Sequence, residues 1–341
     1  MILIKWLNGL PIEYESFLLE KYDSFITTCH YIEVNYPDYD INYFTVHDDG
    51  ELIELLVYGN RGNTARCFNS LTSIDQSVIC EFTKNIFIKH PSITKIEIEA
   101  SYQAYSLNKS FLNFKSNDQI LELPSTLEDY YNKIGSSTRS NARKHKNKLL
   151  RDYPQVKFTT KFGREIENSI IDRIFQLNKD RMESKGTIYQ IDETFKNHTY
   201  LYSQYYGCVA YIEIDGVIVA GSIATILKTG AFSHVIAHDN NYSKYNVGEL
   251  CMLFLVETSI ENRMSTLHFL WGESDYKKRL LAKHHELYFY YIYKSYSIDY
   301  IVTRSKILIY NTLIKFERSK FTKSLRQRIK SYRIKKWMEK S

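Results

Sequence analysis

The sequence has few of the residues that mark specialised protein classes. Its 341 residues include 5 prolines, 13 glycines and 5 cysteines, which argues against collagen-like, low-complexity and disulfide-rich chains. No apolar run approaches about eighteen residues, and the apolar start of the chain is too short for a signal peptide. We therefore predict a cytoplasmic protein without a membrane span. Its cysteines form no C-x-x-C pair and are expected to be reduced core residues: Cys29, Cys67, Cys80, Cys208 and Cys251.

Several catalytic motifs are also missing. The chain has no G-x-G-x-x-G, P-loop, H-E-x-x-H or G-x-S-x-G sequence, which disfavours nucleotide-dependent redox chemistry, phosphoryl transfer, zinc proteolysis and hydrolase chemistry. His284, His285 and Glu286 are adjacent but have no second spaced pair of ligands. No metal is predicted.

The length and charge predict two domains and a tail. A chain of 341 residues fits two domains of about 150 residues each. Residues 301–341 contain 13 Lys and Arg residues and two acidic residues, which gives this segment a net charge of +11. Since the formal net charge of the whole chain is +6, the first 300 residues carry −5. We expect residues 301–341 to be a basic helical tail.

The two halves repeat one order of elements. In the first half, alternating segments flank the turn sequence Asp48-Asp49-Gly50, and a helix and a strand follow; their ranges are 43–46, 52–58, 74–89 and 95–99. In the second half, a hairpin around Asp215-Gly216 precedes a strand, a helix and a strand, at 208–214, 217–227, 231–238, 247–262 and 267–271. The boundary is predicted near residues 123–125, where Pro124 disfavours a helix and Ser125 or Thr126 can cap the next one.

A basic helix is predicted just after this boundary. Helix 127–134 leads into residues 136–151, which contain many Lys and Arg and almost no acids. Arg139 and Arg143 are four residues apart and share a helix face, which suits either a solvated surface or a diphosphate ligand. Arg181, in a helix predicted at 166–182, suits either a contact with the acceptor or a surface salt bridge.

The strand at 230–238 runs through a polar loop into an apolar helix that begins near Val247. The first backbone N–H groups of such a helix are unpaired and lie at the positive end of its dipole. This arrangement predicts an anion site. Asn246 tolerates left-handed backbone nearly as well as glycine does, so a tight turn is expected there.

These two segments, with Gly272-Glu273-Ser274-Asp275-Tyr276-Lys277 after the next strand, resemble the GNAT superfamily of acyl-CoA-dependent N-acyltransferases. The likeness is to its cellulose-biosynthesis-type and FemAB-like branch and covers roughly residues 124–296. That branch has Arg/Gln-x-x-Gly-x-Gly/Ala before the helix and Gly-Asp-Glu-Pro-Tyr-Lys after the strand. Here Ser243 and Asn246 depart from the first pattern, and Gly248 matches it.

The resemblance implies an α/β fold of tandem GNAT-like domains, each a twisted mixed sheet flanked by helices. Its domains would be 1–123, a shortened first copy that buttresses the second; 124–300, the catalytic acyl-CoA-binding copy; and 301–341, the tail. Residues of the strand and of the loop would bind the acyl-CoA donor: Val235, Ile236, Ala237, Ser243, Lys244, Tyr245, Asn246, Val247 and Gly248. The acceptor would contact Arg139, Arg143, Arg181, His238 and Lys277.

Acyl transfer to an amine needs a base for the acceptor, donors for the oxyanion and an acid for the leaving thiolate. His234 and His238 are four residues apart on one strand, so both are expected on one face, and histidine titrates near neutrality. His234 and Glu273 are the alternative bases, and each histidine could instead be a core residue. Tyr276 is the candidate acid, or simply a packing residue.

The leading hypothesis is a bacterial N-acyltransferase that moves an acetyl or hydroxybutanoyl group from coenzyme A to a dTDP- or UDP-linked amino-dideoxy sugar, for lipopolysaccharide or capsule. It would be a monomer or homodimer that binds no nucleic acid. One alternative is a FemAB-like transferase that uses aminoacyl-tRNA and a peptidoglycan precursor. Another is a non-enzymatic protein whose tail binds nucleic acid or an anionic membrane surface.

Overall fold

The computed structural model describes residues 2–107, 111–186, 189, 191–272, 274–294, 298, 300–302, 304 and 305. Glu273 and most of the predicted basic tail lie outside these residues. In the described part of the chain, no helix has both the length and the apolar character needed to cross a bilayer.

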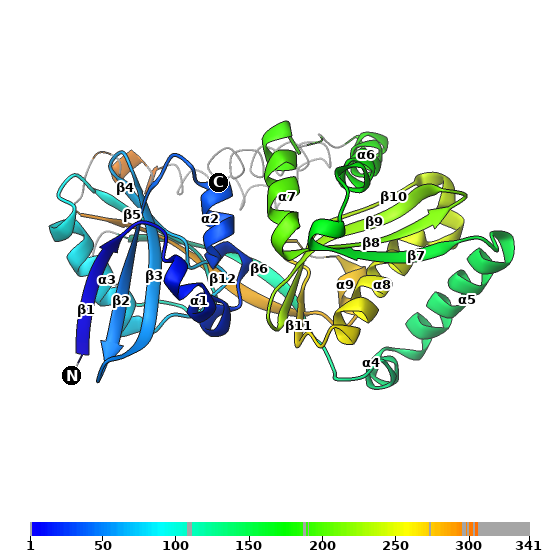
Figure 1. The fold of residues 1–341 in the computed structure, drawn as a ribbon, viewed down its shortest axis with the longest axis horizontal. Helices are drawn as coiled ribbons and strands as arrows, with labels where there is room; N and C mark the ends of the chain where they lie inside the picture. Colours follow the sequence, from blue (N-terminus) through cyan, green and yellow to red (C-terminus); the bar gives the residue numbers. More distant parts are fainter. Residues whose placement is uncertain are drawn as a thin grey trace.

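The described elements mix strands and helices along the chain (Figure 1). The strands are β1 (Ile2–Asn8), β2 (Asp40–Asp48), β3 (Glu51–Arg61), β4 (Thr64–Cys67), β5 (Lys95–Ser101), β6 (Phe111–Glu122), β7 (Lys157–Phe162), β8 (Gly207–Ile214), β9 (Val217–Ile226), β10 (Gly230–His238), β11 (Thr266–His268) and β12 (Lys283–Tyr293). The α-helices are α1 (Glu15–Tyr22), α2 (Cys29–Asn35), α3 (Gln76–Lys89), α4 (Leu127–Lys133), α5 (Ser136–Asp152), α6 (Asn168–Ser184), α7 (Glu193–Tyr206), α8 (Val247–Glu261) and α9 (Asp275–Arg279). Short 3-10 helices are η1 (Ile12–Tyr14), η2 (Phe25–Thr27), η3 (Gly163–Glu165) and η4 (Asn240–Tyr245).

All of these strands belong to one mixed sheet. Its order is β1-β2-β3-β4-β5-β12-β6-β11-β10-β9-β8-β7. Two pairs are parallel, β4 with β5 in the first half and β10 with β11 in the second, and the other pairs are antiparallel. The predicted mixed α/β class with a repeated hairpin, helix and strand is confirmed.

The two hairpins form where the sequence predicts them. Asp49 and Gly50 have φ of 46° and 90°, and Asp215 and Gly216 have φ of 51° and 79°. Positive φ at both central residues defines the type I′ turn, whose twist matches that of the flanking strands. The sequence Asp-Gly therefore fixes both turns locally.

The two strands at the middle of the sheet, β6 and β12, were not predicted from the sequence. β6 follows the first half, while β12 comes from the end of the second half and pairs with both β5 and β6. Figure 1 shows the two strands crossing between the halves. The predicted boundary at residues 123–125 falls between β6 and α4, and the division into domains stays a prediction.

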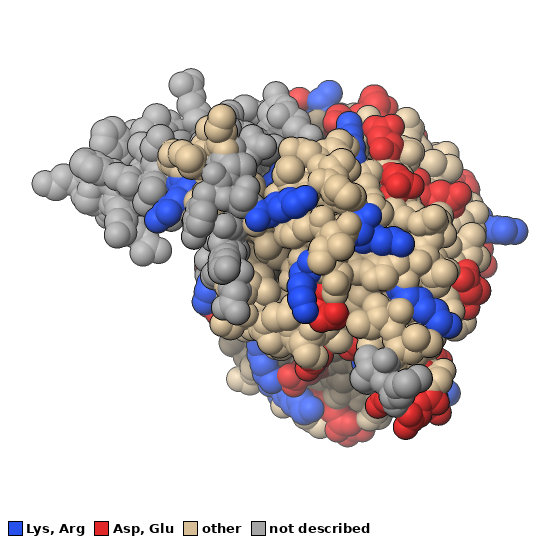
Figure 2. All heavy atoms as spheres, turned by 90° about the vertical axis from the view of Figure 1, so that its left-hand side faces the viewer, with Lys and Arg blue, Asp and Glu red and all other residues tan. Residues whose placement is uncertain are grey.

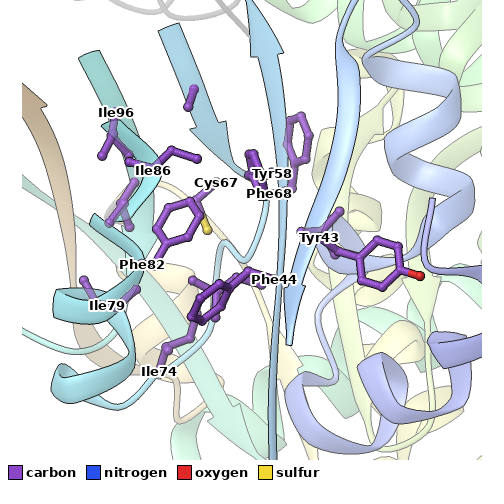
Figure 3. Close-up of a cluster of buried hydrophobic side chains, with 14 of the residues drawn as sticks. Tyr43, Phe44, Tyr58, Cys67, Phe68, Ile74, Ile79, Phe82, Ile86 and Ile96 are labelled. Atoms are coloured by element: carbon purple, nitrogen blue, oxygen red, sulfur yellow. The ribbon is translucent and has the colours of Figure 1, made fainter. Parts of the chain in front are cut away.

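Each half has its own core. In the first half, α3 buries Val78, Ile79, Phe82 and Ile86, and Figure 3 shows Phe82 between Phe44 of β2 and the neighbouring strands. In the second half, α8 is apolar on nearly all sides and is buried along most of its length, as expected for a helix enclosed by other elements. It lies on one face of the sheet with α5 and α9, and α6 and α7 cover the other face (Figure 1).

Candidate active site

The site forms where β10 and β11 part. The strands pair only through Gly230↔Thr266, Ala231↔Leu267 and Phe232↔His268, after which β10 continues to His238 and β11 ends. We call this place the β10–β11 divergence. Strand β11 is shorter than predicted, because the chain after His268 turns its carbonyl groups toward the side chain of Lys277.

Lys277 organises that turn. It is buried, and its ammonium donates hydrogen bonds to the carbonyl oxygens of Phe269, Trp271 and Gly272 at 2.9, 3.0 and 2.9 Å, with a longer contact of 3.4 Å to Leu270. Burial lowers the pKa of Lys277 to about 8, and the carboxylate of Asp118 acts in the opposite direction. The ammonium therefore holds the loop, while its predicted contact with an acceptor stays untested.

The loop between β10 and α8 has the predicted tight turn. Asn246 adopts left-handed backbone with φ of 53° and precedes the first residue of α8. A Cβ at Gly248 would lie 2.5 Å from Nδ1 of His238, so only glycine lets the helix start this close to the end of β10.

A carboxylate of the chain itself lies in the first turn of α8. Glu249 accepts a hydrogen bond from Nδ2 of Asn246 at 2.8 Å. Its two oxygens also accept hydrogen bonds from Arg279, at 3.3 Å from Nε and 2.9 Å from Nη2. This acid, which the sequence analysis did not consider, uses part of the positive helix end that was predicted to bind an anion.

Several predicted donor ligands have side chains committed to packing. Tyr245 is buried, and its hydroxyl donates to Asp152 at 2.9 Å. Val247 is fully buried beneath α5 with Leu149 and Leu250. The other residues predicted to bind the donor lie on different sides of the sheet or in the loop. Val235 and Ala237 pack toward α6, and Ile236 packs toward α8. Ser243 and Lys244 belong to η4, where the ammonium of Lys244 lies 4.8 Å from the ring centre of Tyr245.

The two histidines of β10 do not share a face, so that expectation was wrong. A bulge lies between Ser233 and Val235, which pair with consecutive residues of β9, and His234 is the extra residue. Such an insertion interrupts the alternation of side chains. His234 bonds Thr225 at 2.8 Å on the α7 side of the sheet, whereas His238 lies against the start of α8.

The two imidazoles also have different electrostatic surroundings. Burial lowers the pKa of His234 to about 4, so this ring is neutral at pH 7. Burial and the positive charges of Arg181 and Lys185 lower the pKa of His238.

Arg181 lies within electrostatic reach of two other predicted site residues, His238 and Tyr276. Arg181 is half-buried on α6, and its Nε is buried without a hydrogen-bond partner. One turn earlier on the same helix, Asn178 donates to the carbonyl oxygen of Ile236 at 3.3 Å, which places this face of α6 along the end of β10. Burial raises the pKa of Tyr276, and the charge of Arg181 opposes that rise.

Arg139 and Arg143 lie away from this group, on the exposed surface of α5. Arg139 donates to the carbonyl oxygen of Tyr131 at 2.7 Å, and neither arginine forms an ion pair with a described residue. By contrast, Lys and Arg are interspersed with Asp and Glu on the face of the first half seen in Figure 2. Glu273, the alternative base, lies outside the described residues.

A buried network that the sequence analysis missed lies at the centre of the sheet. Asp118 of β6 bonds both Nδ1 of His268 and the hydroxyl of Tyr102, each at 2.7 Å. No sequence pattern joins these three residues, because they come from distant parts of the chain. No group of three or more His, Cys, Asp or Glu side chains in the described residues is arranged to hold a metal ion.

Comparison with known proteins gives a family for the second half. Residues 136–278 match the acetyltransferase (GNAT) domain family. No curated protein matches the chain in sequence.

Solved structures share the fold over most of the chain. The crystal structure of FemX is 10% identical, with a TM-score of 0.62 over 84% of this chain and 96% of that one. L-PGS from Bacillus licheniformis is 15% identical, with a TM-score of 0.54 over 86% and 96% of the two chains. The C-terminal domain of a putative lysylphosphatidylglycerol synthetase from Agrobacterium fabrum is 11% identical, with a TM-score of 0.51 over 82% and 90%. At these identities the similarity concerns the fold alone. The match of residues 136–278 to the acetyltransferase (GNAT) domain family supports an N-acyltransferase.

Proposed function

We propose that the protein transfers an acetyl or hydroxybutanoyl group from coenzyme A to the amine of a dTDP- or UDP-linked amino-dideoxy sugar used in surface polysaccharides. The observation that carries this proposal is the grouping of Tyr276, Arg181 and His238 at the β10–β11 divergence, beside the turn into α8. A thioester laid along β10 would place its sulfur near a phenol that can return a proton to the thiolate. The GNAT domain match supports coenzyme A as the donor.

The proposed roles follow from position and charge. Tyr276 would protonate the leaving thiolate, while amides of residues 235–237 would hold the thioester oxygen. Arg181 has a half-buried guanidinium with a buried, unpartnered Nε, and such a group favours an anionic or polarised oxygen close by. His234 and Glu273 are the bases that the sequence predicts, but burial lowers the pKa of His234 to about 4, which makes this ring a weak base.

The sugar nucleotide is the finer part of the proposal. Arg139 and Arg143 lie on an exposed helix whose neighbouring side chains are also basic, at Lys144, Lys146 and Lys148. Such a surface suits the diphosphate of a nucleotide-linked sugar. The same surface would suit other phosphate-bearing acceptors.

Two measurements test the donor and the acceptor separately. Acetyl-CoA at a hundredfold excess over its dissociation constant should stabilise the folded protein by about 2.7 kcal/mol, seen as a higher melting temperature. Thiol release from acetyl-CoA should then require a dTDP- or UDP-linked amino sugar. No release across a panel of such sugars and acyl groups would remove the proposed acceptor, and no thermal shift would remove the donor.

One observation favours a second candidate, transfer of an amino acid from aminoacyl-tRNA to a peptidoglycan precursor. The carboxylate of Glu249, held by Arg279, lies where a pyrophosphate would approach α8, and like charges repel. Under the leading proposal, Glu249→Gln should tighten acetyl-CoA binding. If Glu249→Gln leaves acetyl-CoA binding undetectable, and the wild type binds deacylated tRNA with a steep salt dependence, the second candidate takes precedence.

A further inference from the structure

Asp118 is a fully buried carboxylate at the centre of the sheet. One of its oxygens, Oδ2, is held by Nδ1 of His268 and by the hydroxyl of Tyr102, each at 2.7 Å. Tyr102 follows β5, Asp118 belongs to β6 and His268 ends β11, so both halves of the protein fix the position of this carboxylate.

The other oxygen of Asp118 has no hydrogen-bond partner. Oδ1 is buried, and so is Nε2 of His285, whose ring lies 6.5 Å from that of Tyr102. A buried carboxylate oxygen without a donor is unfavourable, and buried polar atoms in native proteins are nearly always satisfied. The positively charged neighbour Lys277 is already engaged by backbone carbonyls. Oδ1 of Asp118 therefore has no donor among the described residues.

The strand register places Asp118 beside the β10–β11 divergence. His268 pairs with Phe232 on one side and with Ile120 on the other. β10 runs parallel to β11, so His234 lies two residues beyond Phe232 in the direction in which the strands part. β6 runs antiparallel to β11, so Asp118 lies two residues beyond Ile120 in that same direction. That is about 7 Å beyond the last paired residues. With β11 ended, the two residues flank the loop after His268 from opposite sides, about two strand spacings or roughly 10 Å apart.

Asp118 and His234 also lie on the same face of the sheet. Directly paired residues place their side chains on one face, and the ring of His268 stacks on Phe232 with centroids 4.4 Å apart. The ring of Phe25 contacts both Phe232 and His234, at 5.1 and 4.7 Å. This is the face opposite α8, so the carboxylate lies across the sheet from the turn predicted to hold the donor.

We infer that Asp118 is the residue that receives the acceptor's protonated amine and removes its proton, with His268 and Tyr102 as positioning residues; this rests on the proposed N-acyl transfer. Oδ1 accepts a hydrogen bond from the ammonium and then takes one proton, which gives a neutral carboxylic acid and a neutral amine. The amine nitrogen bonds to the thioester carbon, the carbon–sulfur bond breaks, and the thiolate takes a proton from Tyr276. As the amide forms, the second amine proton passes through solvent to the Tyr276 phenolate, and Asp118 then releases its proton to solvent.

The surroundings of Asp118 suit this role. The titratable groups facing it are His268, Tyr102, His285 and Lys277, from β11, the segment after β5, β12 and α9. Tyr102 donates its proton to Oδ2, and burial and the negative charge of Asp118 raise its pKa well above the usual range. Tyr102 therefore stays a donor at any pH at which the enzyme is tested. By comparison, His234 is a weak base because burial lowers its pKa to about 4.

The test compares two buried carboxylates that each accept a hydrogen bond from a tyrosine. Asp118→Asn removes the proposed base, and Glu54→Gln is the matched control, since Glu54 is buried in the first half and accepts from Tyr22 at 2.6 Å. Thiol release is measured from pH 6 to pH 10 with the acceptor found for the wild type, alongside melting temperature with and without acetyl-CoA. His268→Gln and Tyr102→Phe are read in the same way.

We expect Asp118→Asn to lower kcat at pH 7 by about 10²- to 10⁴-fold, with the acetyl-CoA-induced melting shift retained. The rate should recover as pH rises and the amine loses its proton to solvent. His268→Gln and Tyr102→Phe should give smaller losses with the same pH recovery, and Glu54→Gln should keep the wild-type kcat. If Asp118→Asn does not fold, the kcat values of His268→Gln and Tyr102→Phe and their recovery at high pH test the inference instead.

Three results would overturn the inference. They are a kcat of Asp118→Asn within threefold of wild type, a loss that is the same at every pH, or an equal loss in Glu54→Gln. A wild type that releases no thiol with any acceptor is a different result, because it removes the proposed function itself and this role of Asp118 with it.

Discussion

The two halves of the protein have the same order of elements but differ at one place. In the first half, β4 and β5 pair from Thr64↔Lys95 to Cys67↔Ile98, and the chain then returns to β5 through the bridge Thr72↔Ser101. In the second half, β10 and β11 pair over three residues and part. The first half therefore closes the position that is open in the second.

The helix starts of α3 and α8 also differ between the two halves, in whether a side chain caps them. α3 begins after Asp75, whose carboxylate accepts a hydrogen bond from the amide of Ser77 at 2.7 Å. α8 begins after Asn246, whose side chain makes no capping bond to the helix backbone. When a capping side chain of the protein accepts a hydrogen bond from the first backbone N–H groups of a helix, fewer of these groups are left to bind a ligand. The start of α3 is therefore capped by its own chain, whereas Asn246 leaves the start of α8 without a side-chain cap.

The largest expected effect is the loss of kcat on substitution of Tyr276. This residue has no counterpart where β4 and β5 are closed by the bridge Thr72↔Ser101 in the first half. We expect Tyr276→Phe to lower kcat by about 10²-fold or more, since general acid catalysis contributes about 10² to 10⁴, and to leave acetyl-CoA binding intact. Tyr58→Phe is the matched control in the first half, where the hydroxyl bonds His90 at 2.9 Å. It should lose about 1 kcal/mol of stability and keep its kcat. Equal kcat values in the two variants would contradict a role for Tyr276 as the acid.

Gly248 and Gly59 sharpen the comparison by steric substitution. A Cβ would lie 2.5 Å from Nδ1 of His238 at Gly248, and 2.8 Å from the ring of Phe68 at Gly59. We expect each alanine variant to lose about 1–3 kcal/mol of stability, as overpacking does. Only Gly248→Ala should also lose the acetyl-CoA-induced melting shift.

The double variant Gly248→Ala with His238→Ala is the control for this explanation. Removing the imidazole gives the new methyl group room, so the donor-induced shift should return at least in part. A shift that stays absent in the double variant would mean that the alanine acts on the helix start and not through His238.

Lys277 gives a pH-dependent test of the open half. Burial lowers its pKa to about 8 in the folded protein, against about 10.4 in an unfolded chain. Between these values the unfolded chain binds more protons, so the contribution of Lys277 to stability is full above about pH 10.4 and is lost as pH falls through about 8.

The free energy of unfolding of wild type minus that of Lys277→Met should therefore rise from pH 7 to pH 10, as measured by urea denaturation. Lys84→Met, at an exposed lysine of α3, should give a difference that does not change with pH. A flat difference for Lys277→Met as well would show that its ammonium is not buried as the structure has it.

The smallest expected effects are at the two helix starts. Asp75→Ala should cost about 1 kcal/mol by removing the cap of α3 and should not change acetyl-CoA binding. Asn246→Ala should cost a similar amount, because alanine disfavours the left-handed backbone at φ of 53°, and should weaken acetyl-CoA binding as well. Asn246→Gly should retain both. Weaker binding in Asp75→Ala would mean that the halves are not separate in function.

The site could be predicted only in part from the sequence. The turn at Asn246 and the helix start beside Gly248 depend on neighbours in the chain, and they were predicted. The relation between His234 and His238 was not, because one inserted residue in β10 moves His234 to the other face. Glu249 was overlooked although it lies in the predicted helix start, since its bond to Arg279 joins residues 30 positions apart.

The sequence by itself determined the local order of this protein: two Asp-Gly hairpins, the helices that follow them and the polar turn into α8. These depend on φ preferences and on hydrophobic periodicity, which act within a few residues. Only the tertiary structure decided that β12 would join the halves, that β10 and β11 would part, and that Asp118, His268 and Tyr102 would meet. Those outcomes depend on strand register and burial between residues up to 198 positions apart, as in the pairing of Tyr293 with Lys95, and no local pattern encodes such pairings.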